Sequence, residues 1–291
     1  MSVCAFIGLG VMGAPMAGHL MKAGHDVRGF NRSPAKAEVW AKAHGGKACA
    51  TIAEAADGAE FIILCVGNDR DVREAVGAAA PAAKLGALFI DHTTASASLA
   101  RALHQDLKAK GLGFLDAPVS GGQAGAEAGR LTIMIGGDAA DFAKAEPALK
   151  AYGHAITHMG EAGAGQLAKM VNQICIAGVV QGLAEGLHFA SRAGLDPALL
   201  IAAISKGAAQ SWQMENRWKS MSEGRFEFGF AVDWMRKDLG LVLEEARANG
   251  ASTPVAALVD QFYAEVQAMG GGRWDTSSLI ARLNRNDAST T

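Results

Sequence analysis

Cysteine is scarce in this chain. Its 291 residues include four cysteines, and no two of them form a CxxC pair. Such widely separated cysteines favour neither a disulfide framework nor a zinc site. We therefore expect Cys4, Cys49, Cys65 and Cys175 to be reduced thiols in a cytoplasmic protein that binds no metal.

Strong charge bias and long apolar runs are absent as well. The formal net charge is -2, and no basic run stands out, which argues against a nucleic-acid or membrane-surface partner. No uninterrupted apolar stretch reaches the ~20 residues that a membrane span needs. The first strand candidate begins at residue 3, so we expect no signal peptide. These absences leave a cytoplasmic protein whose partner is a small molecule.

Short apolar runs and helix-like segments alternate through the first half of the chain. Strand candidates cover residues 3–7, 27–30, 61–66, 88–91, 113–116 and 131–135, and helix candidates cover 11–23, 34–43, 69–79, 96–109 and 138–149. The runs are apolar throughout, which is typical of strands buried on both faces of a parallel sheet. The alternation predicts an α/β fold in which residues 1–160 form a Rossmann-type, doubly wound sheet.

The second half has helical periodicity and almost no strand signal. We expect one long helix from residue 166 to about 192, followed by helices at 197–205, 230–249 and 254–268. Gly178, Gly182 and Gly186 along the long helix suggest close approach of another helix. Residues 161–291 are therefore predicted to form an all-helical substrate and oligomerisation domain, in a homodimer or homotetramer.

A glycine-rich turn follows the first strand candidate. In a GxGxxG pattern that binds a dinucleotide, Gly8 makes the tight turn, Gly10 admits the pyrophosphate, and Gly13 lets the helix pack on the strand. The N–H groups at the helix start then face the phosphates. We expect the cofactor to contact Gly8, Gly10, Val11, Met12 and Gly13.

The second strand candidate ends at Asn31, Arg32 and Ser33, about 20 residues past the loop, where such a site contacts the ribose. No acidic residue stands there to bind the 2′-hydroxyl of NAD. Arg32 can instead bind the 2′-phosphate of NADP through paired, charge-assisted hydrogen bonds. We therefore favour NADP, with NAD as the alternative cofactor. In a second interpretation, Arg32 only caps the next helix beside Ser33 and Pro34.

Two later motifs carry polar groups that suit a carboxylate-bearing substrate. Ser120, Gly121 and Gly122 follow a strand candidate, where they can offer a hydroxyl and N–H groups to a carboxylate, or form an ordinary turn. Lys169 and Asn172 share one face of the long helix among apolar residues. Partial desolvation disfavours the charged form of such a lysine and suits it to proton exchange. The alternative is a lysine that extends to the surface beside a structural asparagine.

Four motifs, in this order, resemble the β-hydroxyacid dehydrogenase family, which includes 3-hydroxyisobutyrate dehydrogenases and tartronate semialdehyde reductases. They are FIGLGVMGAPMAGHL at 6–20, DAPVSGG at 116–122, GAGQLAKMVNQ at 163–173 and KDLGLVLEEA at 237–246. The resemblance covers nearly the whole chain. Four motifs at consistent spacing are far more specific than any one of them.

The resemblance implies a substrate site. It implies that Lys169 is the catalytic acid/base and that Asn172 forms a hydrogen bond with the substrate beside it. By the same resemblance, Ser120, Gly121 and Gly122 hold the substrate carboxylate.

The resemblance also implies cofactor contacts. From its neighbours alone, Lys237 fits an ion pair with Asp238 on a solvated helix face. By the resemblance, it matches a family lysine that closes over the nicotinamide end and contacts substrate and cofactor. Thr94 aligns with a residue near the nicotinamide, and Val66 lies on the loop along the cofactor. The segment 31–33 is similar to the NADP-using branch.

Departures from related families narrow the expected reaction. The 6-phosphogluconate dehydrogenases are longer and have a His-Asn pair where this chain has Val171 and Asn172, which argues against decarboxylation of a phosphorylated sugar acid. Imine reductases usually have no counterpart of Lys169, so this lysine argues against imine reduction. We expect an NADP-preferring oxidoreductase that interconverts a small β-hydroxy acid and its semialdehyde. Substrates of the 3-hydroxyisobutyrate, tartronate semialdehyde, glyoxylate and succinic semialdehyde types stay open. The alternatives are an imine or ketone reductase of the same fold, or a noncatalytic cofactor-binding scaffold.

Overall fold

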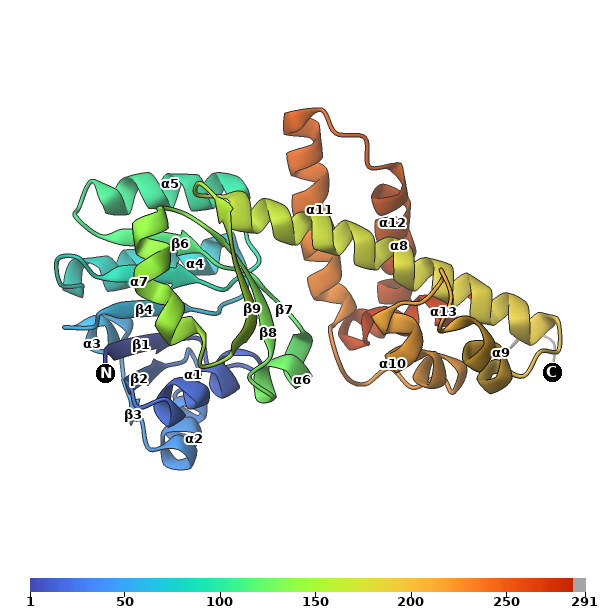
Figure 1. The fold of residues 1–291 in the computed structure, drawn as a ribbon, viewed down its shortest axis with the longest axis horizontal. Helices are drawn as coiled ribbons and strands as arrows, with labels where there is room; N and C mark the ends of the chain where they lie inside the picture. Colours follow the sequence, from blue (N-terminus) through green and yellow to red (C-terminus); the bar gives the residue numbers. More distant parts are fainter. Residues whose placement is uncertain (285–291) are drawn as a thin grey trace. The chain divides into compact units, whose positions relative to one another are not determined.

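A nine-stranded sheet organises Met1–Lys169, the first of two compact units into which the chain divides. The computed structural model describes residues 1–284. The strand order is β3-β2-β1-β4-β5-β6-β8-β7, and β9 pairs with β8 (Figure 1). The strands are β1 (Val3–Ile7), β2 (Asp26–Phe30), β3 (Lys47–Ala48), β4 (Phe61–Leu64), β5 (Leu88–Asp91), β6 (Gly113–Asp116), β7 (Val119–Ser120), β8 (Leu131–Gly136) and β9 (Gly153–Gly160).

Helices cover both faces of this sheet (Figure 1). Alternate residues of β1 point to opposite faces, so Phe6 packs with α1, α2 and α7, whereas Ile7 packs with α3, α4 and α5. Burial on both faces explains why the central strands are apolar throughout. The helices are α1 (Gly13–Lys22), α2 (Pro34–His44), α3 (Ile52–Ala56), α4 (Asp69–Ala79), η1 (Ala80–Ala82), α5 (Ala97–Lys108), α6 (Gly122–Glu127) and α7 (Ala139–Leu149).

The central strands β2, β1, β4, β5 and β6 are parallel, so their carboxyl ends lie at one edge of the sheet. Strand β8 instead runs antiparallel to β6, with Asp116 opposite Gly136. The chain continues past β6 into β7, where Ser120 pairs with Thr132 of β8. Ser120 therefore lies beyond the carboxyl edge, which is where doubly wound sheets bind ligands.

The sheet contains strands that the apolar pattern does not predict. The longest is β9, which pairs with β8 in parallel. Its residues are half-buried or exposed and none is fully buried, so no continuous apolar run marks it. The strand expected at 61–66 ends at Leu64, because the next residues turn away to approach the β5–α5 loop.

The second unit, from Met170 onward, is helical in its described part. Its core joins Ala177, Leu183 and Leu187 of α8 to Leu239 of α11 and Tyr263 of α12. Residues 212–222, which lie outside the expected helices, also form a helix. The Ser211 hydroxyl caps it by accepting a hydrogen bond from Met214 N. The elements are α8 (Ala164–Arg192), α9 (Pro197–Ile204), α10 (Trp212–Ser222), α11 (Val232–Asn249), α12 (Pro254–Ala268), η2 (Gly271–Arg273), η3 (Thr276–Ser278) and α13 (Leu279–Leu283).

Helix α8 is unusually long and apolar. Within residues 1–284 it is the one helix whose length and composition would allow it to cross a membrane, and 44% of its most apolar window is buried in the structure. Core helices of soluble proteins meet the same criterion, so this property alone is weak evidence for a membrane span.

Candidate functional site

The glycine loop between β1 and α1 has the geometry of a phosphate cradle. Gly8 has φ +101°, and a Cβ there would lie 2.2 Å from Cys65 O, so only glycine fits this turn. A Cβ at Gly13 would lie 1.9 Å from Gly8 O, because α1 packs tightly against the turn. Gly10 is different: no atom lies within 4 Å of its Cβ position. Open space beside this backbone is what a pyrophosphate requires, so the loop fits a dinucleotide.

The start of α1 completes the cradle. Met12 occupies its N-cap position without a side-chain cap hydrogen bond, and Val11 beside it is 65% exposed. The N-terminal N–H groups of a helix attract anions when no side chain caps them. Asn31 ties the next strand to this loop, because its Oδ1 accepts a hydrogen bond of 3.0 Å from Leu9 N.

Arg32 extends from the end of β2, and its side chain is 83% exposed. Its Nη1 lies 3.4 Å from Oδ1 of Asp71 in the first turn of α4, and Arg70 Nη2 lies 3.9 Å from the same oxygen. Ser33 is the N-cap residue of α2, without a side-chain cap bond, and Pro34 follows it. The Arg32 guanidinium is thus directed to another element instead of capping α2. An exposed ion pair of this length is weak, so the guanidinium can exchange it for a phosphate.

Two loops meet at the carboxyl edge, after β4 and after β5. Val66 N donates a hydrogen bond of 3.0 Å to Thr93 Oγ1, which joins the two loops. Thr94 lies between Thr93 and Ala95, and both of these neighbours form hydrogen bonds with the side chain of Gln166 on α8. The edge therefore brings Val66 and Thr94, the residues expected along the cofactor, into one hydrogen-bonded network.

Ser120 ends β7, Gly121 is the N-cap residue of α6, and Gly122 begins α6. The two glycines have φ of +126° and +61°, a consecutive pair of conformations that other residues rarely adopt. No atom lies within 4 Å of the Cβ position of Gly122, so the space beside it is open. An irregular turn of this kind can direct N–H groups at an anion.

Lys169 lies in the second turn of α8 and is only 7% exposed. Its helix begins at the carboxyl edge of the sheet, because the buried carboxylate of Asp116 accepts hydrogen bonds from Gly163 N at 2.7 Å and Gln166 N at 2.9 Å. Burial raises the pKa of Asp116 from 3.8 to about 6, against the opposing effect of these N–H donors. Because Lys169 is buried, the interpretation of it as a lysine that extends to the surface is not supported.

Asn172 and Lys237 belong to one chain of polar contacts in the helical unit. Asn172 Nδ2 donates to Gln173 Oε1 at 2.8 Å, and Gln173 Nε2 donates to Asp238 Oδ2 at 2.6 Å. Asp238 Oδ1 lies 3.0 Å from Lys237 Nζ. Gln173 and Asp238 are 1% and 2% exposed. The sequence motifs alone predict no role for Gln173, although a polar residue beside Asn172 in an apolar helix is itself a signal.

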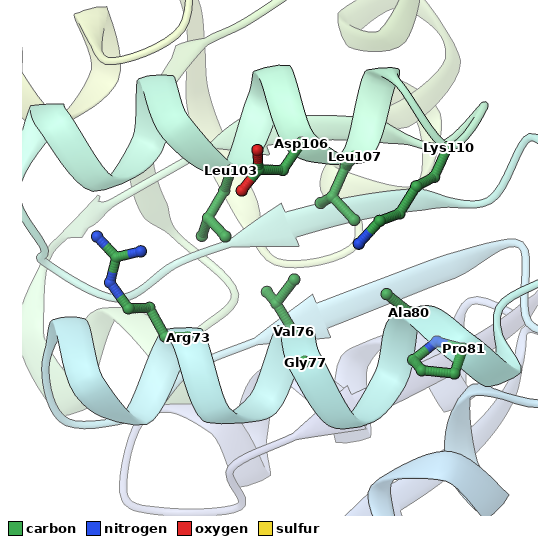
Figure 2. Close-up of a pocket in the computed structure, with 9 residues that line it drawn as sticks. All are labelled: Arg73, Val76, Gly77, Ala80, Pro81, Leu103, Asp106, Leu107 and Lys110. Atoms are coloured by element: carbon green, nitrogen blue, oxygen red, sulfur yellow. The ribbon is translucent and has the colours of Figure 1, made fainter.

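A cavity of about 360 Å³ between α4 and α5 lies apart from these residues (Figure 2). Arg73, Asp106 and Lys110 line it together with apolar residues of α4, η1 and α5. None of the expected site residues takes part. Across residues 1–284, no group of three or more histidine, cysteine, aspartate or glutamate side chains could hold a metal ion.

Comparisons with known proteins indicate the family of the chain. The family model for the NAD binding domain of 6-phosphogluconate dehydrogenase matches residues 3–160, and that for the NAD-binding domain of NADP-dependent 3-hydroxyisobutyrate dehydrogenase matches residues 163–283. An uncharacterized oxidoreductase of Shewanella frigidimarina is 60% identical over 98% of this chain and 99% of its own length. The 3-hydroxyisobutyrate dehydrogenase of Pseudomonas aeruginosa is 37% identical over 90% of this chain and 91% of its own.

A solved structure is similar to nearly the whole of this chain. The Mycobacterium tuberculosis 3-hydroxyisobutyrate dehydrogenase with L-serine has a TM-score of 0.89 and 36% identity, and the match covers 97% of this chain and 99% of that one.

A Rossmann sheet with this glycine loop, matched by NAD-binding family models, defines an NAD(P)-dependent oxidoreductase. More narrowly, the chain belongs to the 3-hydroxyisobutyrate dehydrogenase family, within the β-hydroxyacid dehydrogenases. The expected fold class, a Rossmann-type sheet followed by a helical domain, is confirmed, as is the expectation of an NAD(P)-dependent enzyme.

The contrast between Gly8 and Gly10 gives a paired prediction. Gly8→Ala is expected to lower the free energy of unfolding by about 1–3 kcal/mol, because it combines positive φ with a clash against Cys65 O. Gly10→Ala meets no atom, so it should leave stability nearly unchanged and weaken NADPH binding by roughly tenfold or more, because its methyl group occupies the pyrophosphate approach. Urea unfolding and fluorescence titration with NADPH measure the two effects. Wild-type NADPH affinity in Gly10→Ala would contradict the placement of the pyrophosphate.

Proposed function

We propose that this enzyme is an NADP-preferring oxidoreductase that interconverts a small β-hydroxy acid and its semialdehyde, with Lys169 as the acid/base. The observation that carries the proposal is a buried lysine on a helix whose start is hydrogen-bonded to the cofactor edge of the Rossmann sheet. The M. tuberculosis enzyme was solved with L-serine, and this supports the substrate class because serine is itself a β-hydroxy acid.

The reaction divides between cofactor and protein. When bound, the cofactor supplies the hydride that reduces the carbonyl carbon of the semialdehyde. Lys169, in its ammonium form, donates a proton to the carbonyl oxygen as negative charge develops there, and in the oxidative direction the neutral amine accepts the hydroxyl proton. Positioned proton transfer of this kind contributes about 10²–10⁴-fold to the rate.

The remaining polar residues hold the substrate in this proposal. Ser120, Gly121 and Gly122 bind the carboxylate through a hydroxyl and backbone N–H groups, and the open space at Gly122 supports this role. Asn172 and Lys237 bind substrate, with Lys237 also at the nicotinamide end. The buried Gln173 and Asp238 support their roles because they restrict the rotamers of both side chains.

The proposed preference for NADP rests on Arg32. Its guanidinium stands at the end of β2, the position that contacts the 2′ substituent of the ribose in Rossmann sites, and no carboxylate of that segment competes for the 2′-hydroxyl. Asn31 keeps the segment against the glycine loop. The family model matched by the second half describes an NADP-dependent enzyme, which agrees with this preference.

Removing Arg32 should therefore change the cofactor preference. Arg32→Ala is expected to raise KM for NADPH about 10- to 100-fold, the loss of roughly 1.5–3 kcal/mol for hydrogen bonds to a charged group, and to leave KM for NADH nearly unchanged. Steady-state kinetics with both cofactors measure the change. Arg247→Ala, which removes an equal charge from the last turn of α11, is the control. An equal rise of KM for both cofactors would contradict recognition of the 2′-phosphate by Arg32.

The proposed reaction is tested by a substrate screen. NADPH oxidation is measured with methylmalonate semialdehyde, tartronate semialdehyde, succinic semialdehyde and glyoxylate, and each assay is repeated with NADH. We expect turnover on methylmalonate semialdehyde or tartronate semialdehyde, whose reduction gives a β-hydroxy acid, and a faster rate with NADPH than with NADH at low cofactor concentration. Activity on cyclic imines with none on these aldehydes would replace the proposal with an imine reductase, and a decisive NADH preference would remove the role of Arg32.

We also propose self-association through the helical unit, as a homodimer or homotetramer. An apolar groove of about 550 Å³ runs beside α8 and α9, and Phe189 and Leu195, which line it, are 72% and 50% exposed. Exposed apolar surface of this kind supports a protein interface. The molar mass by light scattering gives the number of subunits.

A further inference from the structure

Gln166 has a side chain that is completely buried and bonded at both ends. Its Oε1 accepts a hydrogen bond of 3.0 Å from Ala95 N, and its Nε2 donates one of 2.8 Å to Thr93 O. The two partners flank Thr94 in the β5–α5 loop, more than 70 residues earlier in the chain. One amide group therefore fixes the backbone on both sides of Thr94.

The backbone of Gln166 is held by a different element. Its N–H donates to Asp116 Oδ2, and Gly163 N donates to the other oxygen of that carboxylate. At Gly165 there is no room even for a methyl group, since a Cβ would lie 2.5 Å from Met134 O and 2.6 Å from Asp116 O. The start of α8 therefore cannot slide along the sheet without breaking these contacts.

Lys169 follows Gln166 by three residues, so the two are neighbours on the helix surface. A movement of the helix at Gln166 is transmitted to Lys169, because the intervening backbone forms one turn of a regular helix. The same residue thus restrains Thr94 through its side chain and Lys169 through its backbone.

We propose that Gln166 is a positioning residue that holds the Thr94 loop and the Lys169 turn at one fixed separation during the reaction. Asp116 supports it by anchoring the helix start. The inference rests on the proposed function, which takes Lys169 as the acid/base and Thr94 as a neighbour of the nicotinamide. A glutamine fits the task because its amide offers one donor and one acceptor, matching a carbonyl and an N–H that would otherwise be buried without partners.

The experiment compares three variants. Gln166→Leu keeps the approximate size and removes both hydrogen bonds. Gln166→Glu keeps an acceptor for Ala95 N but can donate to Thr93 O only when its carboxyl group is protonated. Gln181→Leu is the control, because Gln181 lies on the same helix, is also buried, and donates its hydrogen bond to Glu185 of that helix.

Several measurements separate positioning from simple stability. For Gln166→Leu we expect kcat to fall about 100-fold, as for a displacement of roughly 1 Å at a reacting group. The deuterium isotope effect with 4-deuterated NADPH should rise, and NADPH affinity should stay within about threefold because the phosphate cradle is intact. In the protein without cofactor, hydrogen exchange at residues 93–97 should accelerate. For Gln166→Glu, activity relative to wild type should recover as the pH falls.

The opposing results are equally specific. If Gln166→Leu exchanges faster at residues 93–97 but keeps its kcat and isotope effect, Gln166 is merely structural and the inference fails. The inference also fails if exchange is unchanged, or if Gln181→Leu loses as much kcat. A wild-type kcat in Gln166→Leu together with an inactive Lys169→Met would remove the inference and leave the proposed function in place. Turnover by Lys169→Met would instead remove the proposed function.

Discussion

Replacing Lys169 by methionine is expected to lower kcat by about 10²–10⁴-fold and to leave NADPH binding intact. Methionine approximates the length of lysine and fills the same buried position, of which only 7% is exposed, so packing changes little. What the variant loses is the proposed proton donor for the carbonyl oxygen. The proposed cofactor contacts lie on the glycine loop, on the segment 31–33 and on the loops after β4 and β5, none of which the substitution alters.

Kinetics and chemical rescue test this expectation together. Stopped-flow NADPH oxidation gives kcat, and fluorescence titration gives NADPH affinity. Lys150→Met, which removes an exposed lysine that pairs with Glu146, should behave as wild type. In Lys169→Ala, added primary amines should restore part of the rate, because they can occupy the space of the lost side chain and donate the proton. Near wild-type turnover in Lys169→Met would contradict the acid/base role.

Local sequence chemistry predicts the cofactor half of the fold well. The β1 strand is apolar, the turn after it can only be made by Gly8, and Gly13 must be small for α1 to pack. Each requirement involves residues close in sequence, so the pattern identifies it. The apolar pattern does not predict strand β9, because its exposed positions interrupt any continuous apolar run. Pairing with β8, a distant partner, stabilises it instead.

The residues that organise the site are harder to predict, because their partners are distant in sequence. Gln166 and Asp116 stand inside recognisable motifs, but the hydrogen bonds that give them roles span 47 to 73 residues. The ion pair between Arg32 and Asp71 spans 39 residues and depends on how α4 packs beside β2. A sequence pattern can identify a buried polar residue as unusual, but only the fold shows which group satisfies it.

His92 makes the stability of the sheet unit sensitive to acid. Its Nδ1 lies 2.6 Å from Ala117 O, which can only accept, so this nitrogen carries the proton and Nε2 accepts from Tyr152 Oη at 2.8 Å. Burial lowers the pKa of His92 from 6.5 to about 4. Between these two values the unfolded chain binds a proton that the folded chain does not. The free energy of unfolding therefore decreases as the pH falls. One pKa unit corresponds to roughly 1.4 kcal/mol, so the decrease due to His92 is about 3 kcal/mol.

Asp116 changes the free energy of unfolding with pH in the opposite direction. Its pKa is raised by burial from 3.8 to about 6, so the folded chain binds a proton between these values while the unfolded chain does not. Stability from this group is gained as the pH falls, again by about 3 kcal/mol. Because the two windows overlap, the contributions of His92 and Asp116 should nearly cancel in the wild-type protein between about pH 6 and 4.

Single substitutions should reveal how His92 and Asp116 each change the free energy of unfolding with pH. Relative to wild type, the free energy of unfolding of His92→Gln should rise as the pH falls from 6.5 toward 4. Relative to wild type, the free energy of unfolding of Asp116→Asn should fall as the pH falls from 6 toward 4. Urea unfolding followed by circular dichroism at a series of pH values measures both, and subtracting the wild-type curve removes the titration of all other groups. Tyr152→Phe, which removes one partner of His92 but keeps the buried imidazole, should be less stable at pH 7 yet retain the slope due to His92. Difference curves that stay flat with pH would show that neither buried group changes its protonation on unfolding in this range.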